Sequence, residues 1–227
     1  MLTAIIVAAG SSKRLGFDKL MAPIAGKPVI RHTIDAFEQT KSVTGIVIVT
    51  RADRVKEFEG LVISLDKLEA VIPGGEHRHN SVAAGLKGLS PGARYVAVHD
   101  GARPLITPNQ IEQVFEQARI HAAASLAEPV RDTLKRADSD LIVNGSIDRR
   151  GVYAMQTPQV FERKLLEQAY QRVVDSGEIV TDEVSAVESL GKRVVLVPNS
   201  DVNLKITYES DLHLAEAVLL RRRERGD

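Results

Sequence analysis

Four stretches of the chain are apolar without interruption: residues 3–9, 45–50, 95–99 and 194–197. A strand with one face in water alternates apolar and polar residues, whereas a continuous apolar run is typical of a strand covered on both faces. The four runs therefore predict a central, mostly parallel β-sheet.

Segments with helical periodicity lie between and after these runs. Apolar residues recur there every three or four positions, as expected of helices with one buried face. The five segments are residues 30–37, 82–89, 111–118, 165–173 and 212–219. Alternation of strands and helices predicts an α/β fold.

Residues 128–155 interrupt this alternation. Two short strand-like pieces, residues 133–136 and 141–143, flank the turn-prone sequence Ala-Asp-Ser-Asp, and no helical period is present. We expect a β-hairpin arm, at approximately residues 130–155, that projects from the sheet. Neither an internal repeat nor a linker marks a domain boundary, so residues 1–227 are predicted to form one domain.

Composition narrows the classes of function. Hydrophobic residues make up 44% and charged residues 26%, as in globular proteins with a core. Lys plus Arg equals Asp plus Glu at 30 each, so no net charge recruits nucleic acid or an anionic membrane. Cysteine is absent, which excludes disulfides and thiolate nucleophiles. With neither a signal peptide nor a membrane-spanning stretch, we expect a cytoplasmic protein.

A loop of small and basic residues, AAGSSKRLGFDK at residues 8–19, follows the first predicted strand. Open α/β sheets bind ligands at the carboxyl ends of their strands. Small residues let backbone N–H groups approach an anion, and Arg14 and Lys19 add charge for phosphates. The loop matches neither a P-loop nor a dinucleotide fingerprint. It predicts another type of phosphate-binding loop, with a plain surface turn as the alternative.

A glycine-containing segment, PGGEHRHNS at residues 73–81, follows another probable strand. Its glycines permit close backbone approach, and Ser81 offers a hydroxyl to a nucleobase edge. A glycine turn before a capped helix is the structural alternative. His77 and His79 do not indicate zinc, because positions i and i+2 diverge on a helix and no third ligand stands nearby.

The segment HDGARP, residues 99–104, places an acid and an arginine just past a predicted strand. Asp100 is suited to a hard cation or its waters, and Arg103 to a phosphate. A structural ion pair between the two is the alternative. We expect His99, which has apolar neighbours, to be a hydrogen-bonded core histidine.

Several weaker motifs complete an ordered set: PVRDT (129–133), DRRG (148–151), QTPQ (156–159), TDE (181–183) and NLK (203–205). Taken in order over residues 2–219, the motifs resemble the 2-C-methyl-D-erythritol 4-phosphate cytidylyltransferases of the non-mevalonate isoprenoid pathway. The resemblance implies a Rossmann-like nucleotidyltransferase domain whose arm interlocks two subunits of a homodimer. It also implies cytidylyl transfer from CTP to 2-C-methyl-D-erythritol 4-phosphate, with pyrophosphate as the second product.

The resemblance further assigns roles to residues. Cytosine recognition falls to Ala8, Ala9, Gly10, Gly75, Glu76 and Ser81. The cations that hold the triphosphate or aim the nucleophile are Arg14, Lys19, Arg149 and Lys205. The second substrate meets Asp100, Arg103, Thr157 and Lys205, together with Thr133 and Arg149 from the partner's arm. Mg²⁺ is held mainly by nucleotide phosphates, with Asp100 a candidate contact to metal-bound water.

Three other readings fit parts of this pattern. A cytidylyltransferase for another polyol phosphate, such as ribitol 5-phosphate, would share the nucleotide half of the site. A non-catalytic nucleotide sensor would use the same cleft without turnover. A dinucleotide-dependent oxidoreductase is disfavoured by the glycine spacing of the first loop.

Overall fold

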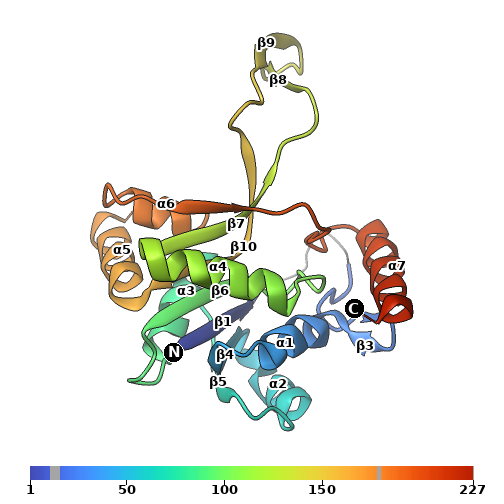
Figure 1. Cartoon of the computed structure of the whole chain (residues 1–227), viewed down its shortest axis with the longest axis vertical. Coiled ribbons are helices and arrows are strands. Elements are labelled where there is room, and N and C mark those ends of the chain that lie inside the picture. Colours follow the sequence, from blue (N-terminus) through green and yellow to red (C-terminus); the bar gives the residue numbers. More distant parts are fainter. Residues whose placement is uncertain (11–15, 178–179, 227) are drawn as a thin grey trace.

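The computed structural model describes residues 1–10, 16–177 and 180–226 (Figure 1). Its centre is a seven-stranded sheet with the strand order β11-β7-β10-β6-β1-β4-β5. The four apolar runs form β1 (Leu2–Ala8), β4 (Val43–Thr50), β6 (Tyr95–Asp100) and β11 (Val195–Pro198). These strands are confirmed, with ends within two residues of the predicted ones.

The sheet is mostly parallel, as predicted, with one antiparallel strand. Parallel pairs join β1 to β4 and β6, β4 to β5 (Leu68–Pro73), and β11 to β7 (Ala123–Pro129). Strand β10 (Tyr153–Glu162) runs antiparallel to both of its neighbours, β6 and β7. The ends of the predicted interruption at residues 128–155 therefore belong to the sheet, and only its middle forms an arm.

The five predicted helices are confirmed as α1 (Val29–Gln39), α3 (Arg78–Lys87), α4 (Pro108–His121), α5 (Arg163–Ser176) and α7 (Glu209–Arg225). Further short elements are β2 (Pro23–Ile24), β3 (Lys27–Pro28), a 3₁₀ turn at Ala52–Arg54, α2 (Val55–Val62) and α6 (Glu183–Glu188). The short helices α2 and α6 contain too few turns for their periodicity to be recognised in the sequence. Within the described ranges, no helix is long and apolar enough to cross a membrane.

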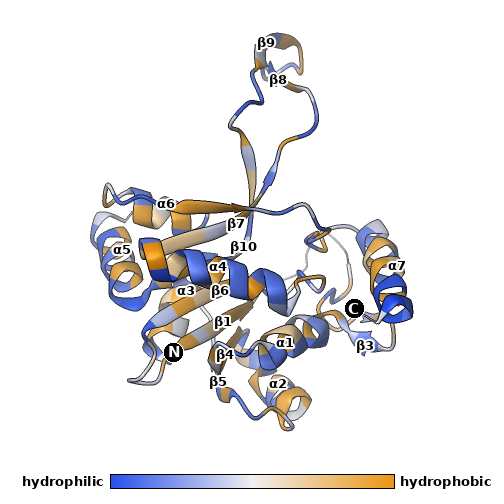
Figure 2. Cartoon of the chain, viewed as in Figure 1, coloured by the Kyte–Doolittle hydropathy of each residue, from blue (hydrophilic) through white to orange (hydrophobic). Residues whose placement is uncertain are grey.

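Helices cover both faces of the sheet. Ile6 of β1 packs in the apolar cluster that includes α1 and α4, whereas Ile5 packs in the cluster that includes α3 and α5. Figure 2 shows hydrophobic colour along the central strands and mixed colour on the surrounding helices. Burial of successive residues on opposite faces explains why the strand sequences are continuously apolar.

The arm is a β-hairpin that rises from the sheet between β7 and β10 (Figure 1). Its strands, β8 (Leu134–Ala137) and β9 (Val143–Ile147), pair antiparallel. The predicted second strand of the hairpin is confirmed, but its predicted start at residue 141 is wrong, because Leu141 adopts a φ of +62° in the turn. The strand therefore begins at Val143, two residues later than predicted.

Candidate functional site

Two loops meet at the carboxyl ends of β1 and β5. A Cβ atom built on Gly74 would lie 2.8 Å from the Cβ of Ala9 and 2.6 Å from the Oγ of Ser81. The backbone N–H of Gly74 donates to the carbonyl of Thr50 at 2.7 Å. A side chain at Gly74 would force the loops apart, so glycine is what allows this close approach. The residues around Ala9 and Gly75 thus form adjacent backbone surfaces.

The side chain of Ser81 fastens the second loop to α3. Ser81 is 1% exposed, and its Oγ lies 3.3 Å from the carbonyl of His77 and 3.5 Å from that of Gly75. The hydroxyl thus contacts its own loop. The neighbouring Gly75 and Glu76 are exposed.

The first loop contributes one described cation. Arg14 lies outside the described residues, so its predicted role has no structural counterpart here. The Nζ of Lys19 donates to the carbonyl of Ile206 at 2.8 Å. This contact brings Lys19 to the segment that carries Lys205, although the two lysines are far apart in the sequence.

Asp100 ends β6 with its carboxylate among positive side chains. Its Oδ2 lies 2.8 Å from the Nζ of Lys205, and its Oδ1 lies 3.3 Å from the Nε of Arg78. Burial alone would raise the pKa of Asp100, but the charges of Arg78 and Lys205 outweigh it and hold that pKa below its ordinary value. Asp100 is therefore ionised at neutral pH, and it fixes the positions of two cations.

Arg103 has a second partner besides Asp100. Its Nε lies 3.9 Å from Oδ2 of Asp100, while its Nη1 donates to the carbonyl of Asn203 at 2.7 Å. Burial lowers the pKa of Arg103. The Nε is buried and has no hydrogen-bond partner among the described residues. A buried donor without an acceptor is costly, and a bound anion would satisfy it.

His99 and Thr157 lie next to Asp100 in the interior of the protein. His99 is fully buried, and its Nδ1 lies 3.0 Å from the Oγ1 of Thr157. Burial lowers the pKa of His99 to about 3, so the ring is neutral at pH 7. The prediction of a hydrogen-bonded core histidine is confirmed. Thr157 is 4% exposed and accepts a hydrogen bond from the backbone N–H of Asp100 at 3.1 Å.

Thr133 and Arg149 are not brought to the other predicted residues. Both side chains are exposed, and both belong to the arm that projects from the sheet (Figure 1). The Nη1 of Arg149 donates to the carbonyl of Arg131, on the facing side of the arm. Within one chain, these two residues stay apart from Asp100.

Two residues of the site, Arg78 and Glu183, were not singled out from the sequence. Arg78 binds both carboxylate oxygens of the fully buried Glu183, with N–O distances of 2.5 and 3.0 Å. The two residues are 105 positions apart. Locally, Arg78 looks like the first residue of a helix and Glu183 like a favourable charge in a first helical turn. The only signal was that both lie within motifs of the ordered set.

Asp100 has limited capacity to bind a metal ion. The described residues contain no group of three or more His, Cys, Asp or Glu side chains that could hold one. Both oxygens of Asp100 already face cations, so this carboxylate does not fit as a direct metal ligand. A hydrogen bond that metal-bound water donates to this carboxylate fits the arrangement.

Comparisons with known proteins agree with one another. A family model described as 2-C-methyl-D-erythritol 4-phosphate cytidylyltransferase matches residues 2–221. The enzyme of that name from Desulforamulus reducens is 39% identical over 97% of both chains, and that from Halalkalibacterium halodurans is 37% identical over 98% of this chain and 99% of its own. The crystal structure of 4-diphosphocytidyl-2C-methyl-D-erythritol synthase from Anaerococcus prevotii has a TM-score of 0.87 and 30% identity, covering 97% of this chain and 98% of its own.

Proposed function

The chain belongs to the 2-C-methyl-D-erythritol 4-phosphate cytidylyltransferase family, and we propose how its residues carry out that reaction. It transfers a cytidylyl group from CTP to 2-C-methyl-D-erythritol 4-phosphate in isoprenoid biosynthesis, giving 4-diphosphocytidyl-2-C-methyl-D-erythritol and pyrophosphate. Neither the family match nor the relatives favour a ribitol 5-phosphate enzyme, a nucleotide sensor or an oxidoreductase.

The reaction joins two anions. An oxygen of the substrate phosphate attacks the α-phosphorus of CTP, and the bond from that phosphorus to the β-phosphate oxygen breaks. Pyrophosphate leaves with the electron pair of that bond. The attacking oxygen is already ionised at neutral pH, so no general base is required. The enzyme must instead offset charge repulsion and align the attacking and leaving oxygens.

The observation that carries the proposal is the group of cations around Asp100. Lys205, Arg78 and Arg103 surround this one carboxylate at the edge of the sheet. With the charges of Asp100 and of Glu183, which binds Arg78, subtracted, the group remains positive and suits the phosphate of the second substrate. Asp100 would orient Lys205, and the Nε of Arg103, which has no hydrogen-bond partner in the part of the chain that the structure describes, would gain an acceptor.

The nucleotide would occupy the space between the two loops. We assign cytosine recognition to the backbone of Ala8, Ala9, Gly10, Gly75 and Glu76, with Ser81 completing that wall. The close approach of Gly74 to Ala9 supports this placement. Arg14 and Lys19 would stabilise charge on the α-phosphate in the transition state. Lys19 donates to the carbonyl of Ile206, the residue that follows Lys205 in the chain, and Lys205 would aim the nucleophile.

Mg²⁺ would enter with the phosphates of CTP and neutralise part of their charge. Asp100 would contact its waters rather than the ion, because both carboxylate oxygens face Arg78 and Lys205.

The arm would complete the site of a second subunit in a homodimer. Thr133 and Arg149 are exposed on the arm, and Leu141 at its tip is 85% exposed. A partner that covers the tip would bring these polar groups to its own substrate site. We also propose that residues 1–227 form a single domain, because the sheet joins strands from both halves of the chain. A cytoplasmic location stays a prediction.

A coupled assay of pyrophosphate release tests this function. We expect turnover with CTP and 2-C-methyl-D-erythritol 4-phosphate that depends on Mg²⁺, and much slower turnover with UTP, ATP or ribitol 5-phosphate. Binding of CTP with no turnover of any polyol phosphate would contradict the proposal and favour a sensor.

A further inference from the structure

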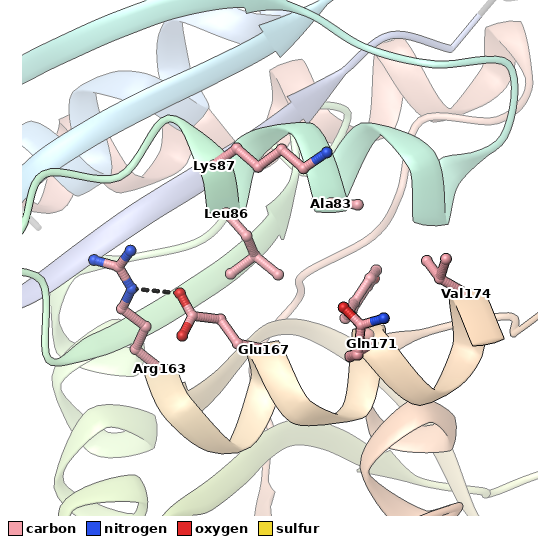
Figure 3. A pocket seen from close by; sticks show the side chains of 8 residues that line it. Ala83, Leu86, Lys87, Arg163, Glu167, Gln171 and Val174 are labelled. Atoms are coloured by element: carbon pink, nitrogen blue, oxygen red, sulfur yellow. Dashed lines mark hydrogen bonds and ion pairs between the residues drawn. The ribbon is translucent and has the colours of Figure 1, made fainter.

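Tyr170 is a buried hydroxyl that the proposed mechanism does not use. Helices α3 and α5 lie side by side around a surface groove of about 500 Å³, which Ala83 and Leu86 line from α3 and Glu167 and Gln171 from α5 (Figure 3). Tyr170 also lines the groove but is only 4% exposed. Its hydroxyl donates to the Oε1 of Glu183 at 2.9 Å, in the interior.

Glu183 is a fully buried carboxylate with a complete set of partners. Burial of an ionised carboxylate is strongly unfavourable unless the charge is paired and hydrogen-bonded. Arg78 supplies two N–H groups and Tyr170 one hydroxyl. The backbone N–H of Glu183 donates to the Oε1 of Gln159 at 3.1 Å, which fixes the start of α6. Oε1 of Glu183 is thus held from two helices, α3 and α5, and Oε2 from α3.

Arg78 connects this interior pair to the site. Its two terminal nitrogens contact Glu183, and its Nε lies 3.3 Å from the Oδ1 of Asp100. The opposite oxygen of Asp100 contacts Lys205 at 2.8 Å. A continuous chain of contacts therefore runs from Tyr170 through Glu183, Arg78 and Asp100 to the lysine that would aim the nucleophile.

We propose that Tyr170, Glu183 and Arg78 are positioning residues that hold Asp100, and through it Lys205, in the orientation needed for cytidylyl transfer. This inference rests on the proposed function and adds to it Tyr170 and Glu183, which need not touch either substrate, and a positioning role for Arg78.

Arg78 is shared between the carboxylates of Glu183 and Asp100, which explains why Tyr170 and Glu183 matter for the position of Asp100. The planar guanidinium of Arg78 is shared, with its two terminal nitrogens on Glu183 and one contact on Asp100. If Glu183 loses the Tyr170 hydroxyl, one of the groups that fix its carboxylate is gone, so the carboxylate can shift and Arg78 shifts with it. Asp100, which Arg78 contacts through its Nε, would shift too, and Lys205 would lose its orientation. The loss should appear in kcat, because Lys205, the residue that loses its orientation, is the one that would aim the nucleophile.

A double-substitution experiment tests the chain of contacts. We expect Tyr170→Phe to lower kcat roughly three- to tenfold with little change in KM for CTP, as removal of one hydrogen bond allows. Arg78→Lys keeps the charge but cannot bridge two carboxylates, so a larger loss is expected. In the Arg78→Lys background, Tyr170→Phe should have no further effect on kcat. Tyr95→Phe, at a buried tyrosine of β6, is the matched control and should act equally in both backgrounds.

Conservative variants of Glu183 separate positioning from loss of folding. We expect Glu183→Gln to lower kcat more than Glu183→Asp, which retains the charge, and melting temperatures would identify any variant that fails to fold. Unchanged kcat in Tyr170→Phe would overturn the positioning role, and so would an equal loss from Tyr170→Phe in the wild type and in Arg78→Lys. In either case, turnover by the wild-type chain would leave the proposed function intact. Absence of turnover by the wild-type chain would overturn both.

Discussion

The edge of the sheet at Asp100 and the tip of the arm meet water in opposite ways. The side chain of Asp100 is 11% exposed and paired with cations of its own chain, whereas Leu141 at the tip is 85% exposed and Ile142 is 64% exposed. Apolar side chains grouped on a thin projection are typical of a surface that another molecule covers. We interpret the body as the self-contained half of the site and the arm as the half that serves a partner.

The largest expected effect is a loss of kcat when a cation of the body is removed. Arg14→Ala and Lys19→Ala should each lower kcat by roughly 10²-fold or more, about 3 kcal/mol, because each removes a cation from the charged transition state. Changes in KM should be smaller, and steady-state kinetics would separate the two. Lys27→Ala is the matched control, since Lys27 is 49% exposed and pairs with Asp35 outside the site. Near-wild-type turnover in both folded variants would remove these residues from the mechanism.

A second prediction concerns acid stability of the body. Burial lowers the pKa of His99 to about 3 from an ordinary 6.5, so the unfolded chain binds this proton more readily. The stability that neutral His99 contributes is full above pH 6.5 and is lost as the pH falls toward 3. We expect about 2–3 kcal/mol of unfolding free energy to be lost through this residue between pH 7 and 4.5.

Urea unfolding at several pH values would measure this loss. The decrease of the unfolding free energy with falling pH should be smaller in His99→Asn than in the wild type. It should be unchanged in Asp148→Asn, a control at an exposed carboxylate of the arm. Equal slopes in the wild type and His99→Asn would show that His99 is not held neutral.

A third prediction concerns the arm. The double substitution Leu141→Asp and Ile142→Asp should weaken self-association roughly tenfold or more, because it places charges where apolar area would be buried. Sedimentation velocity over a range of concentrations would measure the dissociation constant. Val174→Asp, at a 66% exposed position on α5, should leave association unchanged. A dimer that tolerates the tip substitutions would place the interface elsewhere.

The sequence predicts the elements of the fold that have strong periodicity. The strands around Ile5 and Val47 and the five long helices are readable because burial on defined faces dictates their residues. Strand β7 was missed because its alanine-rich sequence has little strand preference. Strand β10 was missed because Gln156, Thr157 and Pro158 interrupt it, and a proline is unusual within a central strand.

The site was predictable where chemistry is concentrated in a local motif. Asp100, Arg103 and Lys205 each follow a strand or belong to a recognised motif, and the structure brings them together. The pair of Arg78 and Glu183 was not predictable, because it forms only when the sheet brings two distant segments together. Local sequence carries no information on which arginine a buried glutamate will meet.

Subunit complementation tests the two-part site most directly. A Lys19→Ala chain retains an intact arm, and an Arg149→Ala chain retains an intact body. In a mixed dimer with two-fold symmetry, one of the two sites would combine both intact halves, so random mixing should restore about a quarter of wild-type kcat. Verified mixed dimers that show only the residual activity of the parents would contradict sharing of the arm between subunits.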